Sequence, residues 1–236
     1  YFGHGTTVAT NMIIERKGAK TALLTTKGFR DLLEIGRQVR PSLYDIMEDK
    51  PETLVRRALR CEVDERTMAD GSIRDEVMQV LDRLKKKGVE SVAVCFLFSF
   101  LNPENERIVE QCIQEPWPEV YCSISSTILP EFREFERLST TVINSYLGPR
   151  MKMYIHNLQE RIREIGVKVE PYITQSNGGV MSISSTIQTP VQTALSGPSA
   201  GVMGAIYVAK AAGFQDIITY DMGGTSTDVS LVKGGI

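Results

Sequence analysis

A carboxylate, two glycines and three hydroxyl side chains follow one another near the C-terminal end of the chain. The run is Asp221-Met222-Gly223-Gly224-Thr225-Ser226-Thr227-Asp228, and β-branched and aromatic segments flank it at 217–220 and 229–232. A strand that ends in a carboxylate, turns at two glycines and continues into a second strand predicts a β-hairpin. Glycines let backbone N–H groups approach an anion closely, and adjacent N–H groups form an anion-binding nest.

These residue types suit the phosphates of a nucleotide together with magnesium. Asp221 is predicted to hold Mg²⁺ through a bound water, because carboxylate oxygens suit this hard cation. Asp221 and Asp228 are the candidate catalytic residues, although an ordinary hairpin turn explains the two glycines equally well from spacing alone. The predicted phosphate contacts are Gly223, Gly224, Thr225, Ser226 and Thr227.

The eight-residue run resembles the phosphate-binding hairpin of the actin-like ATPase fold. More narrowly, it is similar to the signature of the ATP-dependent hydantoinase A and 5-oxoprolinase family, which is related to acetone and acetophenone carboxylase subunits. The resemblance implies an α/β, ribonuclease H-like fold, present in part, with mixed sheets flanked by helices. Three further segments carry the same resemblance, namely 4–11 (HGTTVATN), 21–45 and 175–179 (QSNGG).

The resemblance implies an ATP-dependent enzyme that opens a cyclic amide such as a hydantoin or 5-oxoproline through a phosphorylated amide. ATP and Mg²⁺ are the implied cofactors, and a second subunit or domain of the hydantoinase B type is the implied partner. A capped helix and a plain loop remain alternative readings of segments 4–11 and 175–179. The implied substrate contacts are His4, Thr6, Thr7, Ser176 and Asn177.

Two other functions stay open at this point. One is a subunit of an ATP-dependent carboxylase of the acetone or acetophenone type, which uses the same phosphoryl-transfer machinery. The other is a non-enzymatic actin-like ATP-binding module. The sequence also leaves open which substrate is used, whether the protein forms a homo-oligomer, and where the full-length chain begins and ends.

Composition narrows the classes of partner. A net charge of −2 over 236 residues lacks the excess of positive charge that is typical of proteins that bind nucleic acid or a membrane surface. The longest apolar run, 92–98, is too short to span a bilayer. Four widely spaced cysteines without a Cys-x-x-Cys pair predict reduced thiols in a cytoplasmic protein.

Alternating strand and helix patterns over 57–124 predict an α/β unit with buried strands. Before it, we expect a helix over 8–17 that ends at Gly18. After it, we expect two helices, 131–146 and a second to about 165, separated at Gly148-Pro149.

A last helix is predicted over 196–212, with Gly197 as N-cap and Pro198 at its first position. Small residues at Gly201 and Gly204 predict close approach of another helix. We expect 1–189 to be the central part of the family's N-terminal lobe and 190–236 to begin its ATPase lobe. We also expect the chain to be an internal fragment of a longer protein and to be inactive by itself.

Overall fold

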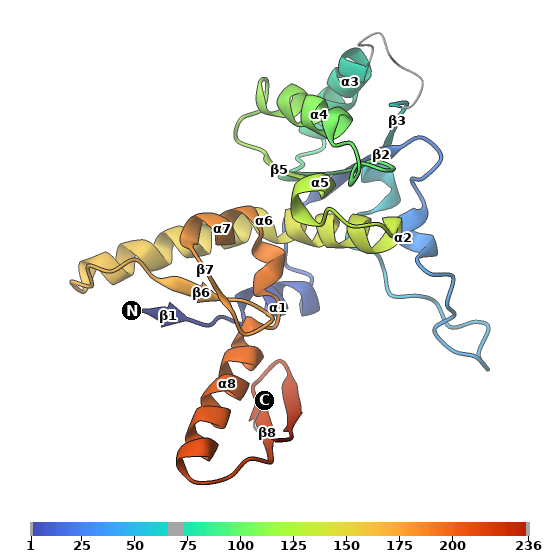
Figure 1. Cartoon of the computed structure of the whole chain (residues 1–236). Helices are drawn as coiled ribbons and strands as arrows, with labels where there is room; N and C mark the ends of the chain where they lie inside the picture. The colour runs from blue at the N-terminus through green and yellow to red at the C-terminus, as the bar shows by residue number, and fades with distance from the viewer. Residues whose placement is uncertain (1, 66–72, 235–236) are drawn as a thin grey trace. The chain divides into compact units, whose positions relative to one another are not determined.

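Residues 2–65 and 73–234 are described by a computed structural model, in which the chain forms two units (Figure 1). Unit 1 joins Tyr1–Lys17 to Arg150–Ile236, and unit 2 is the intervening stretch, Gly18–Pro149. We expected a lobe boundary near residue 190 because the segment that carries the hairpin motif begins there. That boundary stays a prediction. In the described ranges, no helix is long and apolar enough to cross a membrane.

A parallel four-stranded sheet forms the centre of unit 2. Its strand order is β3-β2-β4-β5, and each neighbouring pair is parallel. Parallel strands need crossover connections. Helix α4 lies between the neighbours β4 and β5, and helix α3 lies between β3 and β4, which stand on either side of β2. All five residues of β4 are buried, as its unbroken apolar run predicts for a strand covered on both faces. The strands are β2 Thr21–Thr26, β3 Arg60–Val63, β4 Ser91–Cys95 and β5 Tyr121–Ile124.

Helices cover both faces of this sheet (Figure 1). Helices α3 and α4 pack side by side on one face, while the first part of α6 lies on the other and adds Leu138 and Val142 to the core. The buried residues of α3 recur at helical spacing, as the helix patterns expected within 57–124 require. The shorter elements are α2 Leu32–Ile35, the 3-10 turn η1 Arg57–Leu59, α3 Ile73–Lys86, α4 Glu104–Gln114 and α5 Ser125–Ile128.

Helix α6 runs without a break over Glu134–Glu164, so the predicted separation at Gly148-Pro149 was wrong. A proline inside a helix removes one backbone hydrogen bond and costs about 3 kcal/mol. Here Leu147, Met151 and Ile155 are fully buried on successive turns around the proline. Their packing offsets the missing bond, since tertiary burial supplies most helical stability in proteins.

The two ends of unit 2 contact each other directly. The Ala19 N–H donates to the Tyr146 carbonyl over 2.9 Å. A Cβ at Gly18 would lie 2.2 Å from a ring carbon of Tyr146, so only glycine permits this approach. The sequence assigned Gly18 to the end of the helix over 8–17, but α1 covers only Val8–Ile14 and ends before it. Gly18 is therefore a packing residue rather than a helix stop.

Unit 1 brings distant parts of the chain into one three-stranded sheet, with the order β1-β6-β7. Strand β1 (Gly3–His4) pairs in parallel with β6 (Tyr172–Thr174), which pairs antiparallel with β7 (Val180–Met181). Loops that follow parallel strands leave from the same edge of a sheet, where ligands of α/β proteins commonly bind. The loop after His4 and the loop over 175–179 therefore leave from a common edge.

The C-terminal part of unit 1 is a helix followed by a hairpin, which lie beside each other in Figure 1. Strand β8 (Ile217–Met222) is antiparallel to β9 (Thr227–Val232), which confirms the predicted hairpin. Helix α8 (Ser196–Ala211) ends close to the predicted residue 212, and Gly213 follows at φ +86°, a left-handed conformation that glycine favours. The other elements are α7 Ile183–Gln188 and the 3-10 turn η2 Pro190–Thr193.

The start of α8 differs from the prediction. Leu195, rather than Gly197, occupies the N-cap position with φ 63°, and Pro198 stands third in the helix rather than first. The Leu195 N–H donates to the Thr10 hydroxyl over 2.8 Å, which holds this left-handed turn. The close contact predicted at Gly204 is not found in the part of the chain that the structure describes, because a Cβ there would meet nothing within 4 Å.

We expect Gly148→Ala to destabilise unit 2 by roughly 1–3 kcal/mol, the usual cost of extra bulk in a packed contact. A Cβ at position 148 would lie 2.2 Å from a ring carbon of Tyr121. This clash outweighs the gain in helix propensity, about 1 kcal/mol for glycine to alanine. The measurement is thermal unfolding followed by circular dichroism. Gly204→Ala, at an open helical glycine, is the matched control and should raise the melting temperature. An equal rise in both variants would contradict the close packing on Tyr121.

Candidate functional site

The hairpin β8–β9 sets Asp221 and Asp228 opposite each other. The two residues occupy one paired position of the antiparallel ladder, and Met222 pairs with Thr227 one step nearer the turn. Side chains directly opposite in an antiparallel pair lie on the same face, and the next pair lies on the other face. The two candidate carboxylates therefore share a face, while Thr227 opens β9 on the opposite one.

The turn between these strands leaves its backbone accessible. The Gly223 N–H donates to the Ser226 carbonyl over 3.0 Å and closes the turn. Gly223, Gly224 and Thr225 are exposed, and a Cβ at Gly224 would meet nothing within 4 Å. The Ser226 hydroxyl donates to Asp228 Oδ2 over 3.1 Å and so orients that carboxylate. An anion can reach the turn backbone, with one carboxylate already fixed beside it.

Asp221 points toward helix α8. Its Oδ2 atom lies 4.0 Å from where a Cβ at Gly201 would stand. A groove of about 660 Å³ runs between α8 and the hairpin, and Thr219, Asp221 and Asp228 line its hairpin side. The Asp221 carboxylate is therefore reachable from this groove.

Hydrogen bonds tie the first turn of α8 to the loop that follows β1. The Ser196 hydroxyl donates to the Thr6 carbonyl over 2.9 Å, and the Leu195 N–H donates to the Thr10 hydroxyl. Thr6 itself is buried, and its hydroxyl oxygen accepts the Val8 N–H over 3.2 Å. The structure thus gives Thr6 a part in holding α8, in addition to the substrate contact that remains a prediction for it.

His4 lies at the end of β1 with a partner that the sequence did not indicate. Its Nε2 atom is 2.7 Å from the Tyr154 hydroxyl on α6. Burial lowers the pKa of the His4 imidazole, so its neutral form is favoured. Thr7 is exposed at the N-cap of α1, and its methyl group lies 2.6 Å from where a Cβ at Gly197 would stand. No sequence spacing joins positions 4 and 154, so only the fold reveals Tyr154.

The loop after β6 is held by its own residues and by α8. The Ser199 hydroxyl donates to the Ser176 carbonyl over 2.6 Å. The Ser176 N–H and hydroxyl both donate to the Gln192 carbonyl, over 2.8 and 2.7 Å. Asn177 Oδ1 accepts the Gly179 N–H over 2.9 Å, which leaves the NH₂ group of that carboxamide as a donor. The loop is therefore fixed, with one amide group presented outward.

A second groove, of about 410 Å³, joins this loop to the hairpin. Ser176 and Asn177 line one side, Ser199 and Met203 of α8 line the base, and Asp228 belongs to the hairpin side. The structure thus brings two of the predicted substrate contacts together with one predicted catalytic carboxylate. None of the residues that the structure describes between β1 and α1 lines this groove.

Asp221 and Asp228 suit Mg²⁺ bound partly through water and phosphate better than they suit a metal ion bound only by protein side chains. In the described ranges, no group of three or more histidine, cysteine, aspartate or glutamate side chains gathers to hold a metal. Mg²⁺ commonly keeps several waters and binds through one or two carboxylates together with phosphate oxygens. Asp221 and Asp228, paired on an open hairpin, match that pattern.

Known proteins resemble this chain along nearly its whole length. Caprolactamase subunit alpha from Pseudomonas jessenii is 36% identical over 98% of the chain and 34% of the relative. 5-Oxoprolinase 1 from Arabidopsis thaliana is 35% identical over 98% of the chain and 20% of the relative. The chain therefore spans about a third of the first relative and a fifth of the second.

Two solved structures confirm the fold class. The crystal structure of ATP-dependent caprolactamase from Pseudomonas jessenii matches 96% of this chain and 34% of its own, with 34% identity and a TM-score of 0.81. The nucleotide-free acetone carboxylase structure matches 99% of this chain and 35% of its own, with 27% identity and a TM-score of 0.85. The predicted fold, a partial actin-like ATPase α/β fold, is confirmed by these likenesses.

Two family models match in tandem. The hydantoinase/oxoprolinase N-terminal region matches residues 1–116, and the hydantoinase/oxoprolinase model matches residues 137–236. The second match contains the helix α8, the hairpin and the loop over 175–179 that together form the candidate site. On these two matches, the chain belongs to the hydantoinase/oxoprolinase family.

Proposed function

We propose that the protein carrying this chain uses ATP to hydrolyse a cyclic amide. The observation that carries the proposal is the paired Asp221 and Asp228 on an open Gly-Gly hairpin, in a chain of this family. In the proposed reaction the amide oxygen attacks the γ-phosphorus of ATP. The bond between that phosphorus and the oxygen that leaves with ADP breaks. Water then adds at the amide carbon, the ring C–N bond breaks, and a second water releases phosphate.

The chain's own residues have defined tasks in this proposal. The exposed backbone of Gly223, Gly224 and Thr225 binds phosphate oxygens, with the Ser226 and Thr227 hydroxyls as further donors. Mg²⁺ held by Asp221 through water would neutralise charge that develops on the transferring phosphoryl group. Asp228, oriented by Ser226, completes the acidic side of the site. Positioning and charge stabilisation supply most of the catalysis in phosphoryl transfer.

The loops around α8 are the proposed substrate contacts. Ser176 and Asn177 reach the same groove as Asp228, which supports a cyclic amide bound near the phosphate hairpin. His4, Thr6 and Thr7 belong to the loop that is hydrogen-bonded to the first turn of the same helix. A neutral His4 beside Tyr154 is able to share a hydrogen bond with a carbonyl or amide group.

The proposal also includes a partner and a compartment. The caprolactamase relative is named as a subunit, which supports a second subunit or domain of the hydantoinase B type. The four cysteines, all unpaired thiols in the structure, support the cytoplasmic location expected from the sequence.

A carboxylase is the second candidate. The structural likeness to acetone carboxylase, at a TM-score of 0.85, favours it over a non-enzymatic module. The two activities share phosphate binding and differ in what accepts the phosphoryl group. ATP turnover of the full-length protein that rises with cyclic amides supports the hydrolase, whereas turnover that rises with a ketone and bicarbonate supports the carboxylase.

We expect Asp221→Ala in the full-length protein to lower ATP turnover by about 10²-fold or more, because it removes a group that stabilises charge in the transition state. The measurement is phosphate release at saturating substrate, with circular dichroism to check folding. Asp82→Ala, which removes an exposed aspartate on α3, is the control and should retain full turnover. A folded Asp221→Ala protein with unchanged turnover would exclude this residue from the mechanism.

We expect residues 1–236 by themselves to bind Mg-ATP more weakly than a low micromolar Kd, which corresponds to about −8 kcal/mol. Asp221 and the turn over 223–225 are exposed in the chain, so water competes for every phosphate contact. Calorimetric titration with Mg-ATP measures this directly. Tight binding would mean that the chain, or a dimer of it, builds a closed site from its own residues.

A further inference from the structure

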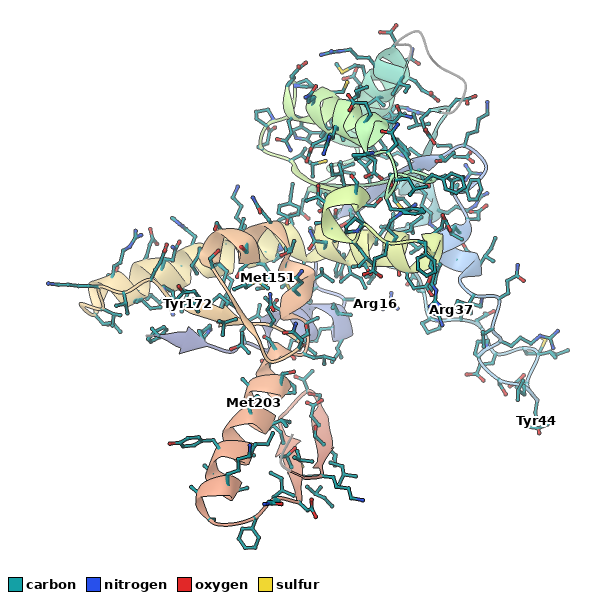
Figure 2. The ribbon with its side chains drawn as sticks, viewed as in Figure 1. Arg16, Arg37, Tyr44, Met151, Tyr172 and Met203 are labelled. Carbon is teal, nitrogen blue, oxygen red and sulfur yellow. The ribbon has the colours of Figure 1, made fainter. Side chains whose placement is uncertain are left out.

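A long loop of unit 2 exposes apolar side chains that lie outside the core. Residues 36–56, all of them described, join α2 to η1 without a helix or a strand. Connections of this length are uncommon in compact domains, and they are usually binding loops or disordered linkers. We call residues 39–49 the apolar arm, and Figure 2 shows Tyr44 at its far end. Its large apolar residues, which are 69–97% exposed, are Val39, Leu43, Tyr44, Ile46 and Met47.

The composition of the arm differs from that of a disordered linker. Such linkers are rich in polar residues, whereas four of the five residues from 43 to 47 are large and apolar. Contiguous apolar surface on a folded protein marks a site of interaction. Tyrosine and methionine are also among the residue types enriched at protein–protein interfaces. The composition therefore favours a surface that another molecule covers.

Hydrogen bonds within the arm and at its base hold its shape. The Ser42 hydroxyl oxygen accepts the Asp45 N–H over 3.2 Å, and Asp45 Oδ1 accepts the Met47 N–H over 2.9 Å. At the base, Lys50 Nζ donates to the Ile35 carbonyl over 2.7 Å. A loop that is already shaped loses less conformational entropy when it docks on a partner.

The charge of the arm limits which partner can cover it. Arg40 is its one cation, and Asp45, Glu48 and Asp49 are its three acids, so its net charge is −2. An anionic membrane surface would repel these acids. A second copy docked arm to arm would bring like charges together. A protein surface with an apolar pocket and a basic rim is complementary to the arm.

We infer that the apolar arm docks on the partner subunit included in the proposed function, in an apolar pocket rimmed by lysine or arginine. The inference therefore rests on that partner. Tyr44 enters the pocket as its anchor, because tyrosine is enriched among the few residues that carry most of the binding energy at interfaces. The acids of the arm face the rim, where charge complementarity speeds association.

Titration of the full-length protein with the purified subunit of the hydantoinase B type measures the contact. We expect Tyr44→Ala to raise Kd at least about thirtyfold, the effect of truncating an interface anchor, and Leu43→Ala to raise it about tenfold. Leu101→Ala is the matched control, since Leu101 is 73% exposed in unit 2 but lies outside the arm. This control should leave Kd unchanged.

Glu48→Gln combined with Asp49→Asn tests the basic rim. Asp45 is kept, because its carboxylate accepts the Met47 N–H and so holds the shape of the arm. Stopped-flow mixing of the two proteins measures the association rate constant. We expect this constant to fall about tenfold at low salt and to depend less on salt concentration. An unchanged salt dependence would exclude a basic rim.

Other occupants of the arm give different results, and each would overturn the inference. A lower melting temperature of full-length Tyr44→Ala, with Kd unchanged, would mean that the arm packs on its own chain. Self-association that Tyr44→Ala removes would identify a second copy, and binding to phosphatidylcholine vesicles that it removes would identify a membrane. Wild-type proteins that do not associate would remove the proposed partner as well, whereas ATP turnover with cyclic amides judges the proposed hydrolase separately.

Discussion

Hydrogen bonds at the first turn of helix α8 hold three separate segments of unit 1 in one place. Ser196 and Leu195 bind the segment that follows β1, and Ser199 binds the loop that follows β6. Ser196 is fully buried, and its partner is a backbone carbonyl, so losing the hydroxyl would leave a buried acceptor unsatisfied. The candidate site depends on this turn, because the three segments contribute residues from positions about 190 apart in the sequence.

The hairpin adds the charged part of the site to that fixed turn. The alternation of its side chains places Asp221 and Asp228 on one face, and both grooves along α8 are lined by Asp228. The acidic groups and the neutral polar groups of the candidate site thus lie on different segments. Acidic oxygens and the exposed backbone of the turn lie at the hairpin, whereas neutral amide and hydroxyl groups lie at the loop over 175–179.

Local patterns predicted the elements whose stability is local. The hairpin and the C-terminal end of α8 follow turn and periodicity rules, and the structure has both close to where those rules place them. The break at Pro149 was wrong because burial of Leu147 and Met151, which a local rule does not see, offsets the proline. The contact between His4 and Tyr154 was missed for the same reason, since it depends on the fold rather than on spacing.

Unit 2 is inserted in the chain between the two parts of unit 1. The contact between Ala19 and Tyr146 affects how easily those two parts can pair during folding. Pairing β1 with β6 joins residue 4 to residue 173, a chain closure whose entropic cost rises with the length of flexible chain enclosed. Once unit 2 has folded, its two ends are fastened together by the hydrogen bond at Ala19. The flexible chain that remains to be closed is then only the short stretches outside unit 2. Folding of unit 2 before β1 pairs with β6 therefore lowers the entropic cost of that pairing, because less flexible chain is left to close.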